Sequence, residues 1–303
     1  MVLILQTDLP LRLFARGKVR DSYDLGDRLL MVASDRVSAF DMVMPCGIPG
    51  KGKVLNKLSA FWFRKTASLL PNHLECEVDD LEVLGRFMPV KENDPALAFL
   101  VGRSMIVKKA QRLPVECVVR GYLSGSAWEE YRRNGVVHFH QMPGGLRESQ
   151  ELPQPLFTPT TKAETGHDEP MNEAELEKLV GQKQARELRE KSIEVYQYAR
   201  RFALTRGFII ADTKMEFGIV DGKLILIDEL LTPDSSRFWD VTLYQVGKSQ
   251  PSFDKQPLRD WLVKTGWNKS PPAPMLSEDI IELTSHRYKE VYRRLTGNEL
   301  EGE

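Results

Sequence analysis

The sequence has few cysteines, no long apolar run and almost no net charge, and each lack argues against a class of protein. Its three cysteines are widely spaced and form no Cys-x-x-Cys pair, which argues against a disulfide framework or a structural zinc site. No apolar stretch approaches the roughly 20 residues that span a bilayer. The formal net charge of -1 gives no support for binding nucleic acid or a membrane surface.

The sequence also lacks a targeting signal at its start. The first residues, MVLILQTDLP, are briefly apolar, but they have no basic region, no long apolar core and no small-residue cleavage site. With the cysteine usage of a reducing compartment, this predicts a cytoplasmic protein.

What is present is a mixture of short apolar runs and amphipathic segments. Strands are predicted at 29–33, 104–109 and 115–119, with a turn at Leu113-Pro114 between the last two. Helices are predicted at 53–69, 126–133, 172–206 (with Gly181 as a point of interruption) and 278–296. The proline-rich stretch 141–171 is predicted to be a long loop.

These elements indicate an α+β fold with antiparallel sheets, because hairpins outnumber βαβ units. A lobe boundary near residue 112 divides the chain. Residues 1–112 would form an antiparallel β lobe with a helix, and residues 113–303 a larger α+β lobe that ends in helices.

Residues 208–230 form the clearest hairpin, with Asp221-Gly222 as its turn. Alternation puts Asp212, Lys214 and Glu216 on one face, which is either a solvated face or part of a magnesium site. A two-residue turn would pair Glu216 with Ile227 and turn Asp228 to the opposite side. We therefore predict a register shifted by one residue, because a shared magnesium site needs both carboxylates together.

Three motifs combine cations or hydroxyl groups with glycine or proline. RGKVRD carries Gly17, Lys18 and Arg20, and is either an ordinary turn or a phosphate-binding loop. RGYLSGS carries Arg120, Ser124 and Ser126 before a helix, and is either a capped helix start or an anion site. TPDSSRFW carries Asp234, Ser236 and Arg237, and is either a structural turn or a second part of that site.

The stretch FTPTTKAETGHDEP at 157–170 contains Lys162 and Asp168. It is either a plain polar loop or a segment that closes over a nucleotide.

Six motifs in this order resemble the successive motifs of the SAICAR synthetase family, in its longer form. They are RGKVRDSY, SDRVSAFD, VECVVRGYLSGSAW, FTPTTKAETGHDEP, DTKMEFG and IDELLTPDSSRFW. The resemblance implies an ATP-dependent ligase that joins L-aspartate to carboxyaminoimidazole ribonucleotide through an acyl phosphate. It also implies an ATP-grasp-like or kinase-like nucleotide cleft, Mg²⁺ as cofactor and, for the longer form, a monomer.

The resemblance also implies roles for individual residues. Catalytic roles fall to Lys162, Lys214 and Asp212. ATP would be bound by Gly17, Lys18, Arg20, Lys109, Gln111, Leu113, Glu216 and Asp228. Substrate would be bound by Ser34, Asp35, Arg36, Ser38, Arg120, Ser124, Ser126, Asp234, Ser236 and Arg237. Mg²⁺ would be bound by Glu216, Asp228 and Asp168.

Two other functions remain open on the sequence alone. A small-molecule kinase with a similar cleft would release ADP without needing aspartate. A nucleotide-binding module without turnover would bind ATP and release no ADP, although such a module need not keep Glu216, Asp228 and Lys162.

Overall fold

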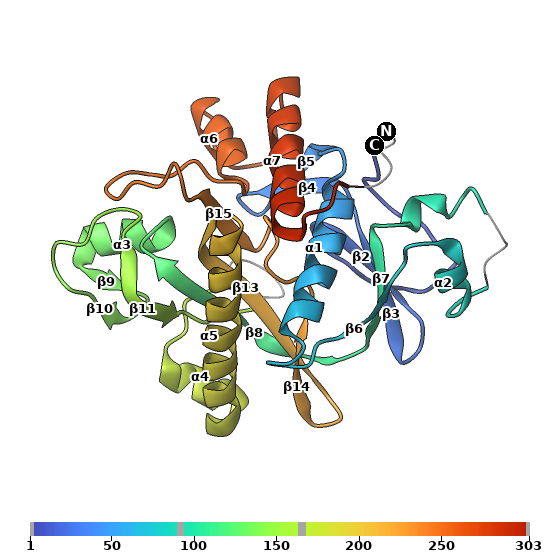
Figure 1. Ribbon diagram of the computed structural model, residues 1–303, viewed down its shortest axis with the longest axis horizontal. Helices are drawn as coiled ribbons and strands as arrows, with labels where there is room; N and C mark the ends of the chain where they lie inside the picture. Colours follow the sequence, from blue (N-terminus) through green and yellow to red (C-terminus); the bar gives the residue numbers. More distant parts are fainter. Residues whose placement is uncertain (1–2, 90–93, 163–167, 301–303) are drawn as a thin grey trace.

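The computed structural model describes residues 3–89, 94–162 and 168–300 of the chain. Two larger antiparallel sheets and several helices make up most of this part (Figure 1). The predicted α+β fold with antiparallel sheets is confirmed. No helix within the described ranges is long and apolar enough to cross a membrane.

The first sheet has five strands in the order β1-β2-β3-β7-β6, and all neighbours are antiparallel. Its strands are β1 (Leu13–Arg16), β2 (Arg20–Asp24), β3 (Arg28–Ala33), β6 (Leu74–Glu77) and β7 (Ser104–Lys108). Leu30, Val32 and Ile106 are completely buried, which explains why the apolar runs at 29–33 and 104–109 form strands, as predicted.

The second sheet carries most of the polar motifs. Its strands are β8 (Gln111–Tyr122), β11 (Glu151–Phe157), β12 (Thr160–Thr161), β13 (Phe208–Val220), β14 (Lys223–Ile227) and β15 (Ser236–Asp240). The order is β11-β8-β13-β14, with β12 also paired to β8 and β15 also paired to β13. The long strands β8 and β13 therefore form the centre of the sheet.

The predicted turn at Leu113-Pro114 is wrong. Both residues lie within β8, where the ladder to β13 is irregular between Glu216 and Gly218. Such an irregularity accommodates a proline, which has no N–H to donate to a ladder. Strands β7 and β8 consequently belong to different sheets instead of forming one hairpin.

The predicted long loop at 141–171 is also partly wrong, because it contains β11 and β12. Strand β11 lies at the edge of the sheet, where Pro153 and Pro155 are tolerated. These prolines hid the alternation that would have predicted a strand. Residues 163–167 of the predicted closing segment lie outside the described residues.

Two short ribbons complete the strands. Strand β4 (Arg36–Ala39) pairs with β5 (Met42–Gly47), and β9 (Val136–Val137) pairs with β10 (His140–Gln141).

The helices in the described part of the chain are α1 (Lys51–Thr66), α2 (Leu81–Gly85), α3 (Ser126–Asn134), α4 (Glu173–Val180), α5 (Gln182–Thr205), α6 (Gln256–Lys264) and α7 (Glu278–Thr296), with a 3-10 turn at Ala98–Leu100. The predicted helices begin and end close to the predicted positions, whereas α2 and α6 were not predicted. Asn172 and Glu175 form the expected capping box. The helix predicted at 172–206 is divided at Gly181, where φ is 85°.

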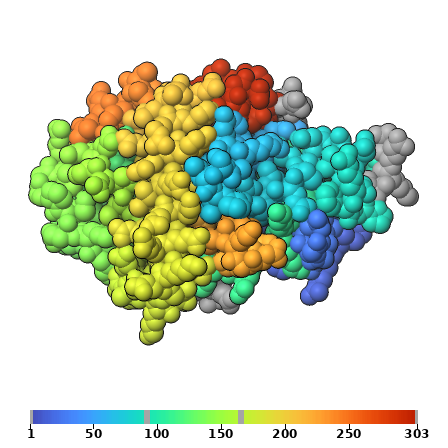
Figure 2. Space-filling view, turned by 60° about the horizontal axis from the view of Figure 1, so that its bottom comes forward, coloured from blue at the N-terminus to red at the C-terminus, as the bar shows by residue number. Residues whose placement is uncertain are grey.

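One apolar core joins both sheets to the long helices. It contains Trp62 of α1, Val107 of β7, Phe217 of β13, Tyr196 of α5 and Tyr288 of α7. In Figure 2 the orange tip of the β13–β14 hairpin lies between α4 and α5, in yellow, and the blue-to-cyan N-terminal residues. Because helix α5 covers one face of the second sheet, the other face is left for polar side chains.

The segment between β14 and β15 is held by a buried ion cluster around Asp234. Its carboxylate accepts hydrogen bonds from Lys51 Nζ at 2.8 Å and Tyr288 Oη at 2.5 Å, and Lys255 Nζ lies at 3.0 Å. Burial disfavours the charged carboxylate, but Lys255 and Lys51 lower the pKa of Asp234 far below its usual range. This cluster fixes the segment against α1 and α7.

Removal of the Asp234 carboxylate should destabilise the whole protein. Asp234→Ala leaves the buried Lys51 ammonium without its anionic partner, and breaking such a buried pair costs about 3–5 kcal/mol. Urea denaturation at pH 7 measures the loss in free energy of unfolding. The control is Glu173→Ala, which breaks an exposed ion pair with Arg189 and should cost less than about 1 kcal/mol. Equal losses from the two variants would contradict this account.

Candidate active site

One face of the β8–β13 pair carries a row of charged side chains, which we call the charged row. Alternation along β13 places Asp212, Lys214 and Glu216 on this face. The register sets Arg120 of β8 beside Asp212, and Glu116 of β8 beside Glu216. The opposite face of β13 packs into the apolar core, so the predicted common face of the three β13 residues is confirmed.

Two lysines neutralise two buried carboxylates at one end of the charged row. Lys162 Nζ lies 2.5 Å from Glu116 Oε1 and 2.6 Å from Glu216 Oε1. Lys214 Nζ donates to Glu116 Oε1 at 2.8 Å. Both carboxylates are more than nine-tenths buried, so each needs a positive partner in order to remain ionised.

The pKa values follow from these contacts. Burial opposes the charge of Lys162, but Glu216 and Glu116 raise its pKa above the usual lysine range. Lys214 also has a raised pKa, because Glu116 outweighs the effect of burial. The pKa of Glu216 is raised by burial and then by the negative charge of Asp228. Both lysines are therefore cations at neutral pH and do not act as bases.

Asp228 comes near Glu216 without the predicted shift of register. The hairpin has the unshifted register, with Glu216 opposite Ile227 and Val220 opposite Lys223, so that prediction is wrong. Asp228 instead follows the last residue of β14 and has a left-handed backbone, with φ 62°. This local conformation breaks the alternation, and the charge of Asp228 then acts on Glu216.

Arg20 of the first sheet reaches this end of the hairpin. Its guanidinium lies 2.8 Å from Glu229 Oε2 and 3.7 Å from Asp228 Oδ1. Glu229 also accepts a hydrogen bond from Thr232 Oγ1 at 2.5 Å. Arg20 thus connects RGKVRD to the end of β14, although about 200 residues of sequence separate them.

The other end of the charged row is basic. Arg237 Nη1 donates to Asp212 Oδ2 at 2.5 Å, and Arg120 Nε donates to Thr158 Oγ1 at 3.1 Å. The pKa of Arg237 is raised chiefly by Asp212. Ser124 Oγ lies 3.4 Å from Asp212 Oδ2, so the predicted RGYLSGS and TPDSSRFW motifs do come together.

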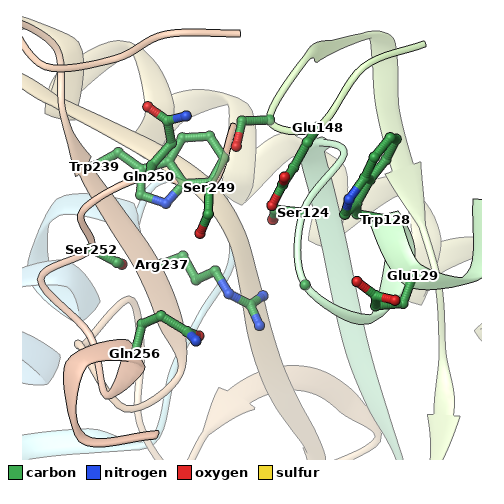
Figure 3. Close-up of a pocket in the computed structure, with 12 residues that line it drawn as sticks. Ser124, Trp128, Glu129, Glu148, Arg237, Trp239, Ser249, Gln250, Ser252 and Gln256 are labelled. Atoms are coloured by element: carbon green, nitrogen blue, oxygen red, sulfur yellow. The ribbon is translucent and has the colours of Figure 1, made fainter. Parts of the chain in front are cut away.

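A pocket of about 200 Å³ opens beside Arg237. Figure 3 shows Arg237 reaching toward the segment before α3, with Trp239 and Gln250 beside it and Trp128 and Glu129 on the far wall. Its lining residues are Ser124, Gly125, Trp128, Glu129, Glu148, Ser149, Arg237, Trp239, Ser249, Gln250, Ser252 and Gln256.

Gly125 is required where the segment before α3 passes Arg237. A Cβ atom there would lie 2.6 Å from Arg237 Nη2, and the φ of Gly125 is 56°. Ser126 begins α3 and is exposed beside it.

Ser34 and Arg36 of the SDRVSAFD stretch are buried and support the RGKVRD loop. Arg36 donates to the carbonyl oxygens of Gly17 and Lys18, and it also forms an ion pair with Asp21. Ser34 donates to the carbonyl oxygen of Val19. Ser34 and Arg36 therefore stabilise the loop through hydrogen bonds, and they are not part of the charged row.

Four other predicted substrate or phosphate residues also lie apart from the charged row. Asp35 is buried in an ion pair with Arg103 at 3.1 Å, and Ser38 is a buried residue of β4. Ser236 faces the core side of β15 and donates to Thr213 Oγ1 at 2.8 Å. Lys18 is exposed, 2.5 Å from Asp41.

The residues expected around adenine lie near the start of β8. Lys109 forms an ion pair with Asp24 at 3.0 Å and lies over the ring of Phe14. Gln111 is exposed, whereas Leu113 is buried in the core. Asp168 is exposed, and residues 163–167 between it and Lys162 lie outside the described residues.

Glu116 is a residue of the site that sequence reasoning missed. It lies in VECVV and contacts both lysines of the charged row. The signal that could have found it was a single carboxylate inside an otherwise apolar strand. A buried carboxylate is rare unless it is paired, so its position predicted a cationic partner. Its partners lie 46 and 98 residues away in the sequence, so no local pattern could name them.

Comparison with known proteins gives consistent results. A profile described as SAICAR synthetase matches residues 13–274 of the chain. The phosphoribosylaminoimidazole-succinocarboxamide synthase of Thermodesulfovibrio yellowstonii is 51% identical over 97% of this chain and 98% of its own length. The enzyme of the same name from Syntrophobacter fumaroxidans is 50% identical over 99% of this chain and 98% of its own length.

Solved structures agree with the sequence comparison. A SAICAR-synthase from Saccharomyces cerevisiae, solved in complex with SAICAR, is 43% identical, has a TM-score of 0.89, and is matched over 99% of this chain and 100% of its own. A SAICAR synthetase from Pyrococcus horikoshii is 24% identical and has a TM-score of 0.66. It is matched over 93% of this chain and 100% of its own, and it shares the fold.

The fold, the charged row and these similarities define an ATP-dependent ligase. The chain belongs to the SAICAR synthetase family, which acts in purine biosynthesis. The resemblance of the six motifs is thus confirmed, and neither a kinase nor a non-catalytic module is favoured.

Loss of the charge on Glu116 should impair turnover more than folding. Glu116→Gln keeps the shape of the side chain but removes the anion that holds Lys162 and Lys214. Misplacement of such groups by about 1 Å costs on the order of 100-fold in rate, so kcat for ADP release should fall by about that factor. Glu151→Gln, which alters a half-exposed carboxylate of β11, should keep native kcat. A native kcat for Glu116→Gln would refute the assignment.

Proposed function

We propose that this chain joins L-aspartate to the carboxylate of carboxyaminoimidazole ribonucleotide at the expense of ATP. The products are the succinocarboxamide ribonucleotide, ADP and phosphate, on the route to IMP. The observation that carries the proposal is the charged row, where Lys162 meets cations and carboxylates of β8 and β13.

The reaction needs an activated carboxylate, because oxide is a poor leaving group. An oxygen of the substrate carboxylate attacks the γ-phosphorus, the bond from phosphorus to the ADP oxygen breaks, and an acyl phosphate forms. The aspartate amine then attacks the carbonyl carbon, the C–O bond to phosphate breaks, and the nitrogen gives up a proton. Catalysis of such transfers rests mainly on positioning and charge neutralisation.

Lys162 and Lys214 are suited to that neutralisation. Both remain protonated, as their raised pKa values indicate, and both are held in place by Glu116. We assign them to the charge that moves between the γ-phosphate and the acyl phosphate. Asp212 orients Arg237 at the other end of the charged row.

The basic end of the charged row would bind the phosphate of the ribonucleotide. Arg237 and Arg120 offer planar guanidinium groups, which match phosphate oxygens. The start of α3, with Ser126 and nearby Ser124, adds a hydroxyl and backbone N–H groups. The pocket beside Arg237 supports this placement.

The nucleotide would lie toward the first sheet. Gly17, Lys18 and Arg20 would meet its phosphates, and Lys109 with Gln111 and Leu113 would border adenine. Residues 1–112 would then form the lobe that covers ATP, and residues 113–303 the lobe that holds the substrate. The contact of Arg20 with the end of β14 supports this arrangement.

Glu216 and Asp228 suit Mg²⁺, with Asp168 as a further proposed ligand. Burial and then the charge of Asp228 raise the pKa of Glu216. A divalent cation would relieve the repulsion between the two carboxylates, and carboxylate oxygens are the ligands Mg²⁺ prefers. No group of three His, Cys, Asp or Glu side chains that could hold a metal gathers among the described residues, so the other ligands of the ion would have to come from phosphate and water. When bound, Mg²⁺ neutralises the charge of the triphosphate.

We also propose that the protein is cytoplasmic, as its cysteine usage predicts, and monomeric, as its resemblance to the longer form of the family implies.

The proposed reaction is tested by ADP release from ATP with carboxyaminoimidazole ribonucleotide, with and without L-aspartate. We expect release that requires both substrates, with one succinocarboxamide formed for each ADP. Release without aspartate would support a kinase instead. Binding of ATP without release under either condition would support a module without turnover.

Removal of one proposed metal ligand should stop turnover. Asp228→Asn keeps the shape of the side chain, so the variant should unfold at nearly the native temperature. Its kcat should fall by more than about 100-fold, because loss of a residue that only supports a metal ligand already costs up to about 100-fold. The matched control is Asp221→Asn in the exposed turn of the same hairpin, where φ is positive and asparagine is tolerated. If Asp228→Asn keeps near-native kcat, the metal assignment is wrong.

A further inference from the structure

Two arginines flank one carboxylate across three neighbouring strands. The register pairs Asp212 of β13 with Arg120 of β8 on one side and with Arg237 of β15 on the other. Asp212 accepts a hydrogen bond from Arg237 Nη1 at 2.5 Å, and Arg237 Nε lies 4.0 Å from Asp254 Oδ2. Asp212 and Asp254 therefore both act at contact distance on Arg237.

Arg120 differs from the other cations of the charged row, because a neutral group holds it. In the described part of the chain no carboxylate lies within 4.0 Å of its guanidinium nitrogens, whereas both lysines of the row and Arg237 have such a partner. Burial lowers the pKa of Arg120, yet an arginine stays charged at neutral pH. Arg120 thus keeps a positive charge that no carboxylate offsets at contact distance.

The neutral group is the hydroxyl of Thr158, which accepts from Arg120 Nε at 3.1 Å. Thr158 is completely buried and directly follows β11, where Phe157 pairs with Val119 of β8. Its backbone N donates to the carbonyl oxygen of Val118 at 2.8 Å, and its hydroxyl donates to the same oxygen at 3.4 Å. Since the single hydroxyl proton is used there, the hydroxyl oxygen is left to accept from the guanidinium.

The bond at Nε leaves the outer edge of the guanidinium for a ligand. Nη1 and Nη2 of Arg120 have no hydrogen-bond partner within the described ranges. A guanidinium presents its donors in a rigid planar fork, so a bond at Nε also fixes the direction of the two outer nitrogens. Groups that are held in their binding orientation lose less entropy when a ligand binds.

We infer that Thr158 is a positioning residue, which holds the Arg120 guanidinium for the phosphate group of the ribonucleotide without neutralising its charge. The inference rests on the proposed function, because a sugar phosphate reaches Arg120 only if the ribonucleotide binds at this end of the charged row. A role in folding alone makes the opposite expectation. Loss of the hydroxyl would then lower Tm and leave phosphate affinity unchanged.

Two substitutions remove the hydroxyl. Thr158→Val keeps the shape of the side chain, and Thr158→Ala avoids crowding by a second methyl group. Loss of one hydrogen bond to a charged group corresponds to about a 10-fold change in an equilibrium constant, so the KM for carboxyaminoimidazole ribonucleotide should rise about 10-fold in both variants. Their kcat and their KM for ATP should stay native, because the phosphate contact is the same in the ground state and the transition state. Thr158→Ser keeps the hydroxyl and should have a near-native KM.

Binding of ribose 5-phosphate measures the same effect without turnover. Calorimetric titration in the absence of ATP should give a Kd that rises about 10-fold in Thr158→Val and stays near native in Thr158→Ser. Arg120→Ala should weaken binding at least as much, because it removes the cation itself. Uncharged ribose is the control ligand, and its binding should be the same in all variants.

Thr66→Val is the matched control for loss of a buried hydroxyl. Thr66 is completely buried, and its hydroxyl donates to the carbonyl oxygen of Trp62 at 2.8 Å within α1. The substitution should lower Tm without changing the affinity for ribose 5-phosphate or the KM for the ribonucleotide. Three results would each overturn the inference: native affinity in Thr158→Val and Thr158→Ala, no restoration in Thr158→Ser, or an equal loss of affinity in Thr66→Val.

The inference and the proposed function can fail separately. If the native protein shows no aspartate-dependent turnover, the proposed function fails, and the titration still decides whether Thr158 sets the anion affinity of Arg120. If turnover is normal but ribose 5-phosphate does not bind, or binds independently of Arg120, the inference fails alone.

Discussion

The site depends on the pairing of carboxylates that the second sheet buries. Glu116 and Glu216 face each other across β8 and β13, and an unpaired buried charge costs several kcal/mol. Lys162 and Lys214 offset that cost, and in doing so they become fixed cations beside largely buried carboxylates. Electrostatic interactions are stronger in such surroundings than in solvent, which is what a reaction that moves phosphate charge requires.

The rest of the fold brings distant segments to this row. Arg20 comes from the first sheet, Asp228 from the end of the hairpin and Arg237 from the strand beyond it. The continuous apolar core and the buried Asp234 cluster limit the movement of these segments relative to one another. Preorganised groups of this kind avoid the cost of reorganisation during the reaction.

Much of the fold could be predicted where the local signal was strong. The amphipathic helices, the capping box at Asn172 and the 208–230 hairpin all rest on periodicity or turn chemistry within a few residues. The predictions at Leu113-Pro114 and at 141–171 failed because proline was taken as a break. In the structure a bulge or an edge position accommodates it.

The sequence by itself determined which charged residues alternate on β13 and which motifs occur in order, and these sufficed to predict the family. Only the tertiary structure decided how Asp228 turns toward Glu216, that Glu116 joins the site, and that Ser236 and Asp234 point inward. The physical reason is that alternation is a property of neighbours along one strand. Side-chain pairing and a left-handed backbone depend on contacts between residues far apart in the chain.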